Sequence, residues 1–310
     1  MQIGISLPNI GPNATPEAIY AIADKADELG FDTVWTSDHL ALPRHPALPY
    51  PDSRGTSRTL DANTPILDPL AVMAAVAGRT KRVKICVGVL VLPIRHPLVT
   101  AKLVSAIDQL SGGRVILGVG TGWIPEEFAA AGVSIKQRGA MTDEQIRYLR
   151  EVWSQETPEF AGRFYSISDM SVEPKPVRRG VPIWVGGNTD HAMRRAAALG
   201  DGLHMIDLTN AEAQKRIAQF QEICRAANRP LEHLTLSVFN QIRITKDRLE
   251  ESERNFPITG NLEQVIADLQ FLQSLGVQHV AFSPRPRGMD VPAYLRVMEM
   301  IAREIIPAVA

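Results

Sequence analysis

The chain has 310 residues, of which 45% are hydrophobic and 22% are charged, and its formal net charge is -1. This composition is typical of a soluble globular protein and argues against a disordered, fibrous or membrane-spanning chain. Lysine plus arginine (33) balance aspartate plus glutamate (34), so no basic surface for nucleic acid or anionic lipid is indicated. The two cysteines, Cys86 and Cys224, have no spacing typical of a zinc or redox site, so we expect no metal and a reducing cytoplasm.

The first elements in chain order are a strand, a helix and a second strand. Residues 3–7 form a short apolar run without the basic region and long apolar core of a signal peptide, so they predict a strand. Thr15 and Pro16 offer an N-cap and an N1 proline, and Gly30 stands where a left-handed C-cap would end the helix. Residues 31–35 are then the second strand.

The same alternation of strand and helix continues to the end of the chain. Its strands are continuous apolar runs, which are typical of parallel strands covered on both faces. Eight strands are predicted, at residues 3–7, 31–35, 83–92, 115–119, 182–185, 202–206, 234–244 and 277–282. After the first helix, others are predicted at residues 67–79, 97–110, 137–153, 189–199, 211–227, 261–275 and 291–305. The pattern predicts one (β/α)8 TIM barrel domain over residues 1–310, with an open doubly wound sheet as the competing architecture.

Three connections are longer than ordinary ones, at residues 41–66, 155–180 and 245–260. We expect them to be insertions or lids at the C-terminal rim of the barrel, where they would select the substrate. The longest apolar run, residues 85–94, is too short to cross a membrane.

The most informative segment for function is Trp-Thr-Ser-Asp-His at residues 35–39, at the end of the second predicted strand. Residues just past the C-terminal ends of barrel strands line the reaction site. His39 is therefore a candidate catalytic group, with a structural histidine as the alternative. Asp38 is expected to support a neighbouring segment instead, because adjacent strand residues point to opposite faces.

Two later strands end in glycines, at residues 118–122 and at Gly186 and Gly187. Glycines at a strand-to-helix turn let backbone N–H groups approach a phosphate, although such glycines are also common in ordinary tight turns. The G-x-G-x-G spacing of residues 118–122 lacks the G-x-G-x-x-G arrangement of a dinucleotide site, so a Rossmann NAD site is not predicted.

Four collinear segments resemble the luciferase-like monooxygenase superfamily, in its branch of deazaflavin-dependent oxidoreductases. They are residues 35–39, residues 110–123 (Leu-Ser-Gly-Gly-Arg-Val-Ile-Leu-Gly-Val-Gly-Thr-Gly-Trp), Lys175-Pro176, and residues 182–187 (Pro-Ile-Trp-Val-Gly-Gly). The resemblance runs over nearly the whole chain. It implies a flavin-type cofactor inside a (β/α)8 barrel and, by analogy, a homodimer.

The resemblance also implies roles for single residues. It places His39 at the reactive edge of the cofactor ring, where an imidazole can assist hydride transfer by hydrogen bonding or proton exchange. Val89 and Leu90 match a bulge on the third strand with a non-prolyl cis peptide that backs the ring, with a plain core strand as the alternative. Thr121 and Gly122 match a loop that contacts the polar tail or phosphate of the cofactor.

Further candidates follow from the same resemblance. Gly186 and Gly187 match a backbone cradle for the phosphate. Trp123 is expected to wall the substrate pocket, unless it is an ordinary core aromatic. Asn9 is a candidate contact of the ring, and Arg138 is a candidate phosphate contact, with a solvated arginine at a helix end as the alternative.

The expected function is coenzyme F420-dependent hydride transfer between C5 of the deazaflavin and a small organic substrate. Arginines in the predicted rim loops are candidates for the charged tail of F420, namely Arg44, Arg54, Arg58, Arg285 and Arg287. One alternative is an FMN-dependent monooxygenase of the bacterial luciferase type, and a separate flavin or F420 reductase or dehydrogenase is a candidate partner. An alternative of another class is a non-redox lyase that uses the glycine loops for a substrate phosphate.

Overall fold

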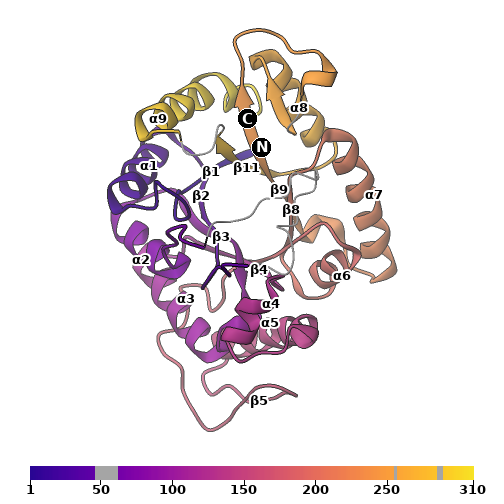
Figure 1. The fold of residues 1–310 in the computed structure, drawn as a ribbon. Coiled ribbons are helices and arrows are strands. Elements are labelled where there is room, and N and C mark those ends of the chain that lie inside the picture. The colour runs from indigo at the N-terminus through magenta and orange to yellow at the C-terminus, as the bar shows by residue number, and fades with distance from the viewer. Residues whose placement is uncertain (46–61, 255–256, 285–288) are drawn as a thin grey trace.

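The computed structural model describes residues 1–45, 62–254, 257–284 and 289–310, in which parallel strands form a barrel surrounded by helices (Figure 1). The barrel strands, in their order around it, are β1 (Gln2–Ser6), β2 (Thr33–Thr36), β3 (Lys84–Val91), β4 (Val115–Gly120), β7 (Ile183–Gly186), β8 (Gly202–Ile206), β9 (Thr235–Ile244) and β11 (His279–Pro284). Strand β11 pairs back with β1, so that Ile3 lies opposite Val280. This closure confirms the (β/α)8 prediction and excludes the open sheet.

Helices surround the barrel, and all of them except the short α4 lie close to their predicted positions. They are α1 (Pro16–Leu29), α2 (Pro69–Arg79), α3 (Pro97–Ser111), α4 (Pro125–Ala130), α5 (Arg138–Ser154), α6 (Asp190–Leu199), α7 (Asn210–Ala226), α8 (Leu262–Ser274) and α9 (Val291–Met300), and a π-helical turn (Ile301–Ile305) follows α9. The caps of the first helix are as predicted. The side chain of Thr15 accepts the N–H of Ala18, and Gly30 ends α1 with a φ of 83°.

Some short elements were not predicted. They are α4, the hairpin of β5 (Phe160–Ala161) and β6 (Ser166–Ile167), strand β10 (Ile258–Gly260), and 3-10 turns at Leu92–Ile94, Ile135–Gln137, Leu231–His233 and Glu251–Glu253. The short strands pair in an antiparallel hairpin, β5 with β6, or at the edge of the barrel, β10 with β9. Elements this short carry too few residues for a hydrophobic period to show.

The long connections lie at two different ends of the barrel. Residues 41–66 follow β2 and residues 245–260 follow β9, so both leave the C-terminal rim; residues 46–61 and 255–256 within them lie outside the described part of the chain. Residues 155–180 instead follow a helix and lead into β7, so the expectation of a lid on the C-terminal rim is wrong for them. Connections that run from a helix to a strand belong to the opposite end of the barrel.

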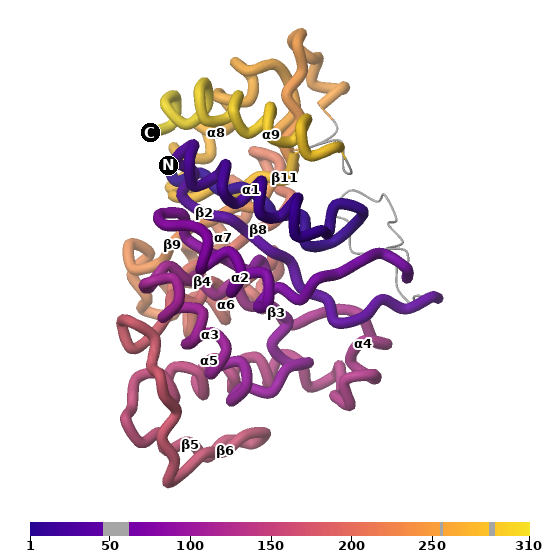
Figure 2. Tube along the Cα trace, turned by 90° about the vertical axis from the view of Figure 1, so that its left-hand side faces the viewer, coloured from indigo at the N-terminus to yellow at the C-terminus, as the bar shows by residue number. Residues whose placement is uncertain are grey.

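Contacts along residues 155–180 show where this connection packs. The carboxylate of Glu144 on α5 accepts the N–H groups of Arg163, Phe164 and Tyr165, and the carboxylate of Asp108 on α3 accepts that of Val177. The connection therefore covers the outside of α3 and α5. In Figure 2 its hairpin lies well away from α4.

The interior of the barrel contains a buried chain of polar and aromatic side chains. Trp35 donates from Nε1 to Thr33 Oγ1 (2.7 Å), and Thr33 Oγ1 lies 2.8 Å from His279 Nε2. Ser237 Oγ lies 2.8 Å from Nδ1 of both His279 and His204. The ring of His204 stacks on Trp35 with centroids 4.3 Å apart. This chain ties together β2, β8, β9 and β11.

None of the helices in the described ranges has the length and apolar character that a membrane span requires.

Candidate active site at the ends of strands β2, β3 and β4

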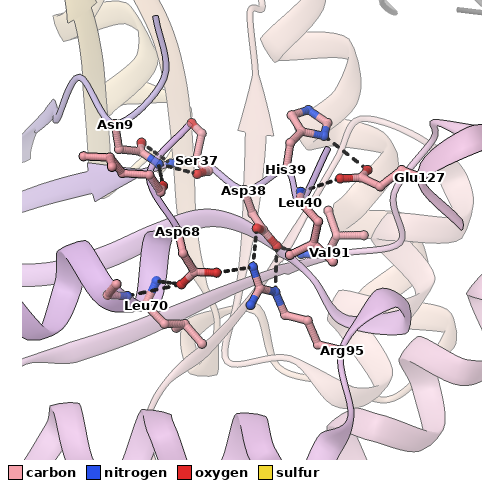
Figure 3. A network of polar contacts seen from close by, with 12 residues as sticks. Asn9, Ser37, Asp38, His39, Leu40, Asp68, Leu70, Val91, Arg95 and Glu127 are labelled. Atoms are coloured by element: carbon pink, nitrogen blue, oxygen red, sulfur yellow. Dashed lines mark hydrogen bonds and ion pairs between the residues drawn. The ribbon is translucent and has the colours of Figure 1, made fainter. Parts of the chain in front are cut away.

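His39 lies just past β2 and contacts a buried carboxylate that the sequence did not single out. Its Nδ1 is 3.3 Å from Oε2 of Glu127 (Figure 3). Oε1 of the same carboxylate accepts the backbone N–H groups of Leu40 (2.6 Å) and Ala41 (3.4 Å). Glu127 is only 2% exposed. One carboxylate thus holds both the imidazole and the backbone that follows it.

Helix α4 brings Glu127 to this position. The helix begins with Pro125, whose missing N–H costs nothing in a first turn, and its first turn carries Glu126 and Glu127. Phe128 packs against Val91 and fixes the helix on the end of β3. The sequence signal was present, because a proline followed by two acids comes directly after a predicted rim loop. That pattern marks a helix start but does not reveal which residue the acid meets.

Asp38 turns away from His39 and binds the end of β3. Its carboxylate accepts the N–H of Val91 (2.9 Å) and two bonds from Arg95, at 2.6 and 3.2 Å. Arg95 also donates to Asp68 at 2.8 Å. Burial raises the pKa of Asp38 above its ordinary value, although the bonds from Arg95 and Val91 act in the other direction. The run that carries His39 is therefore anchored on both sides, by Asp38 and by Glu127.

The bulge implied on the third strand is confirmed. The register between β3 and β4 shifts between Val87 and Leu90, and the peptide bond between Gly88 and Val89 is cis. The side chain of Val89 faces the barrel interior, since a Cβ on Gly186 would lie 2.3 Å from one of its methyl groups. Leu90 instead is fully buried in the core between the barrel and its helices. Val89 is thus the residue of this pair that presents its side chain to the inside of the barrel.

The loop after β4 brings Trp123 next to His39. The two rings meet edge to face, with centroids 6.2 Å apart and an interplanar angle of 86°. Thr121 and Gly122 are partly exposed beside them. Gly122 has a φ of 72°, and a Cβ there would lie 2.7 Å from the ring of Phe128, so its backbone and packing both require glycine.

The carboxamide of Asn9 already has partners within the protein. Its Nδ2 donates to the carbonyls of Ser37 (2.7 Å) and Leu67 (2.9 Å), and its Oδ1 accepts the N–H of Ser37 (2.9 Å). The side chain is 1% exposed. Asn9 therefore joins three segments of the rim, and the ring contact that the resemblance implies stays a prediction.

Some of the remaining predicted phosphate contacts, like Asn9, already have partners within the protein. The N–H of Gly187 donates to the carbonyl of His204 (3.0 Å), so this N–H already has a partner within the sheet. Gly186 leaves space that Val89 occupies. Arg138 donates to the carbonyl of Ile135 (2.9 Å) at the start of α5. Arg44 is exposed. The other rim arginines, Arg54, Arg58, Arg285 and Arg287, lie outside the described residues.

A model of the luciferase-like monooxygenase family matches residues 1–291. The chain belongs to this family. A luciferase-like relative, the F420-dependent glucose-6-phosphate dehydrogenase of Amycolatopsis mediterranei (strain U-32), is 31% identical over 242 residues, which are 76% of this chain and 67% of that protein. Curated mycobacterial relatives that are 34% identical over 183 residues match 59% of this chain, and the match spans 63% of their own length.

Two solved structures share the luciferase-like fold of this chain. An F420-dependent secondary alcohol dehydrogenase in complex with an F420-acetone adduct has a TM-score of 0.79 at 21% identity, covering 100% of this chain and 99% of that one. The oxygenating constituent of 3,6-diketocamphane monooxygenase from Pseudomonas putida, in complex with FMN, has a TM-score of 0.76 at 18% identity, with coverages of 100% and 99%. At these identities the likeness establishes the fold alone.

Proposed function

We propose that this chain is an oxidoreductase that binds coenzyme F420 at the C-terminal end of its barrel and transfers a hydride to or from a small organic substrate. The observation that carries the proposal is the placement of His39 at the rim, with Nδ1 on Glu127 and its ring against Trp123, beside the bulge of β3. The F420-dependent relative from Amycolatopsis mediterranei favours this cofactor.

The residues at the site fit a flat, largely apolar ring. Val89 offers an apolar surface from the inside of the barrel, and Trp123 offers an aromatic wall. Among the described residues, no hydrogen-bond partner is found for Nε2 of His39. Such a set of apolar walls with one polar group is typical of a cofactor pocket. When bound, F420 supplies a carbon that accepts or gives a hydride.

His39 is the group that we assign to proton exchange with the substrate. An imidazole both accepts and donates a proton at small cost near neutral pH, which suits a reaction in which a hydride and a proton move together. Its side chain is 10% exposed, so it is shielded from bulk water but still reachable. Asp38 and Glu127 keep the run around it in place.

The alternative within the same family is an FMN-dependent monooxygenase, which the FMN-bound structure of similar fold keeps open. It would use the same barrel end and would need a separate reductase to supply reduced flavin. A non-redox lyase has less support, because the matching family model is that of luciferase-like monooxygenases and the Amycolatopsis relative is an F420-dependent dehydrogenase.

Binding of the two cofactors decides between these functions. Purified protein is titrated into F420 and, separately, into FMN, and the fluorescence of each cofactor is followed. We expect saturable quenching of F420 and much weaker quenching of FMN. Tight binding of FMN alone would favour the monooxygenase, and binding of neither would contradict the proposal.

His39→Ala is predicted to slow substrate-dependent F420 reduction by about a hundredfold, because it removes the proton-exchanging group. The dissociation constant for F420 should change little, because the apolar walls remain. The measurement is kcat and cofactor affinity side by side. His233→Ala, which removes an exposed histidine, is the matched control and should leave both unchanged. Unaltered turnover in His39→Ala would remove His39 from the mechanism.

A further inference from the structure

We propose that Glu127 fixes the single proton of neutral His39 on Nδ1, so that Nε2 faces the site as a proton acceptor. In this form the resting enzyme is set to oxidise a hydroxyl-bearing substrate. The assignment of the proton to Nδ1 concerns the protein alone, whereas the oxidation of a hydroxyl-bearing substrate rests on the proposed function.

The contacts of Glu127 show that its carboxylate acts as an acceptor. Oε1 accepts the N–H of Leu40 at 2.6 Å and is 3.4 Å from that of Ala41, and both donors are backbone groups that cannot exchange roles. These bonds use the carboxylate as an acceptor, and its second oxygen is turned toward His39 in the same role. Oε2 is 3.3 Å from Nδ1 of His39. A contact between an acceptor-only oxygen and a ring nitrogen requires that the nitrogen carry the proton.

Contacts on both sides of His39 fix the position of its imidazole ring. The residue before His39, Asp38, is bonded to Val91 at the end of β3 and to Arg95. The residue after it, Leu40, is bonded to Glu127 on α4. Trp123 packs edge to face against the ring. Figure 3 shows the second nitrogen of His39 directed away from Glu127. The proton on Nδ1 therefore leaves the lone pair of Nε2 on the side away from the carboxylate.

In this tautomer, Nε2 of His39 can accept a proton from the hydroxyl group of the substrate. In the oxidation of a secondary or primary alcohol, the substrate O–H bond breaks as its proton passes to Nε2. F420, when bound, would take the hydride from the adjacent C–H bond as a C=O bond forms. The two electrons would leave with the hydride, the proton would remain on Nε2 of His39, and the carboxylate of Glu127 would balance the positive charge of the imidazolium. A buried carboxylate behind a histidine stabilises the imidazolium that forms in this step.

Glu127→Gln keeps the size of the side chain but replaces one carboxylate oxygen with an NH2 group. The Gln side chain keeps an oxygen for the N–H of Leu40, but it places an NH2 group opposite Nδ1. That group donates, so the imidazole should adopt the opposite tautomer, with its proton on Nε2. The matched control is Glu17→Gln, which changes an exposed acid in the first turn of α1.

Nitrogen NMR of histidine-labelled protein reads the tautomer without cofactor or substrate. The measurement is made at about pH 8, where an ordinary histidine is neutral, and His39 is assigned by comparison with His39→Ala. We expect the wild type and Glu17→Gln to show protonated Nδ1 and bare Nε2, and Glu127→Gln to show the reverse. A wild-type spectrum with the proton on Nε2 would overturn the proposal even if the variant did not fold.

Kinetics test the consequence. Glu127→Gln should lower kcat for alcohol oxidation by about a hundredfold with KM and the F420 dissociation constant nearly unchanged, and Glu17→Gln should match the wild type. In the double variant His39→Ala/Glu127→Gln, kcat should be no lower than in His39→Ala alone, because the two residues act as one unit. A further drop in the double variant would show that Glu127 does not act through His39. If the NMR result holds but F420 does not bind, the tautomer assignment stands and the proposed function fails.

Discussion

At the level of single residues, His39 differs in its burial from His204 and His279. His39 lies at the rim with one ring nitrogen on a carboxylate and the other directed away from it. His204 and His279 lie inside the barrel, where burial lowers the pKa of His204 to about 3 and that of His279 well below its ordinary value. Both are neutral at physiological pH, and their hydrogen bonds to Ser237 give them a structural role.

The buried pair predicts a specific dependence of stability on pH. Because both pKa values are lower in the folded protein, the unfolded chain binds more protons below pH 6.5, so stability is complete above that pH and is lost as the pH falls. Between pH 6 and pH 5, His204 alone should lower the free energy of unfolding by roughly 1 kcal/mol, and His279 should add to this loss.

Urea unfolding at a series of pH values checks this prediction. His204→Asn keeps a hydrogen-bonding group near Ser237 but does not titrate, so its loss of stability over the same pH range should be smaller by roughly 1 kcal/mol. His233→Asn changes an exposed histidine and should follow the wild type. Identical slopes for His204→Asn and the wild type would show that His204 is not buried in neutral form.

At the level of elements, the site depends on how three strand ends fit together. Strand β3 carries the bulge, and its Val89 fills the space that Gly120 on β4 and Gly186 on β7 leave open. A Cβ on either glycine would lie 2.3 Å from a methyl group of Val89. The absence of side chains at these positions is therefore explained by packing against the bulge.

Gly186→Ala should destabilise the protein by about 1–3 kcal/mol, because the added methyl group overlaps with Val89, a side chain with little freedom at χ1. The double variant Gly186→Ala/Val89→Ala should recover part of this loss, since the smaller residue makes room. The free energy of unfolding in urea, measured for both single variants and the double variant, gives their coupling. Simple additivity of the two single effects would contradict the packing seen here.

The elements differ in how far the sequence predicted them. The barrel strands and their long helices were predicted because buried parallel strands are continuous apolar runs and because Thr15 and Gly30 mark helix ends. Helix α4 was missed because six residues show no clear period. The contact between His39 and Glu127 joins residues 88 positions apart, and no local pattern indicates such a pairing. The bonds of Asn9 to Ser37 and Leu67 likewise join residues that no local pattern pairs.

At the level of the whole molecule, the closed barrel decides which segments can serve the site. Connections that follow strands reach the C-terminal rim, so His39, Trp123 and α4 gather there from β2 and β4. Residues 155–180 belong to the other end and to the outside of α3 and α5. The length of a connection predicted an insertion, but only the direction of the preceding element shows on which side it lies.

We propose above that the end of the barrel at β2, β3 and β4 is an F420 site served by His39. A crystal structure of the protein with bound F420 tests it most directly. We expect the deazaflavin to lie against Val89 with its reactive edge toward Nε2 of His39, while Glu127 keeps its bond to Nδ1. A cofactor bound elsewhere, or with its reactive edge away from His39, would contradict it.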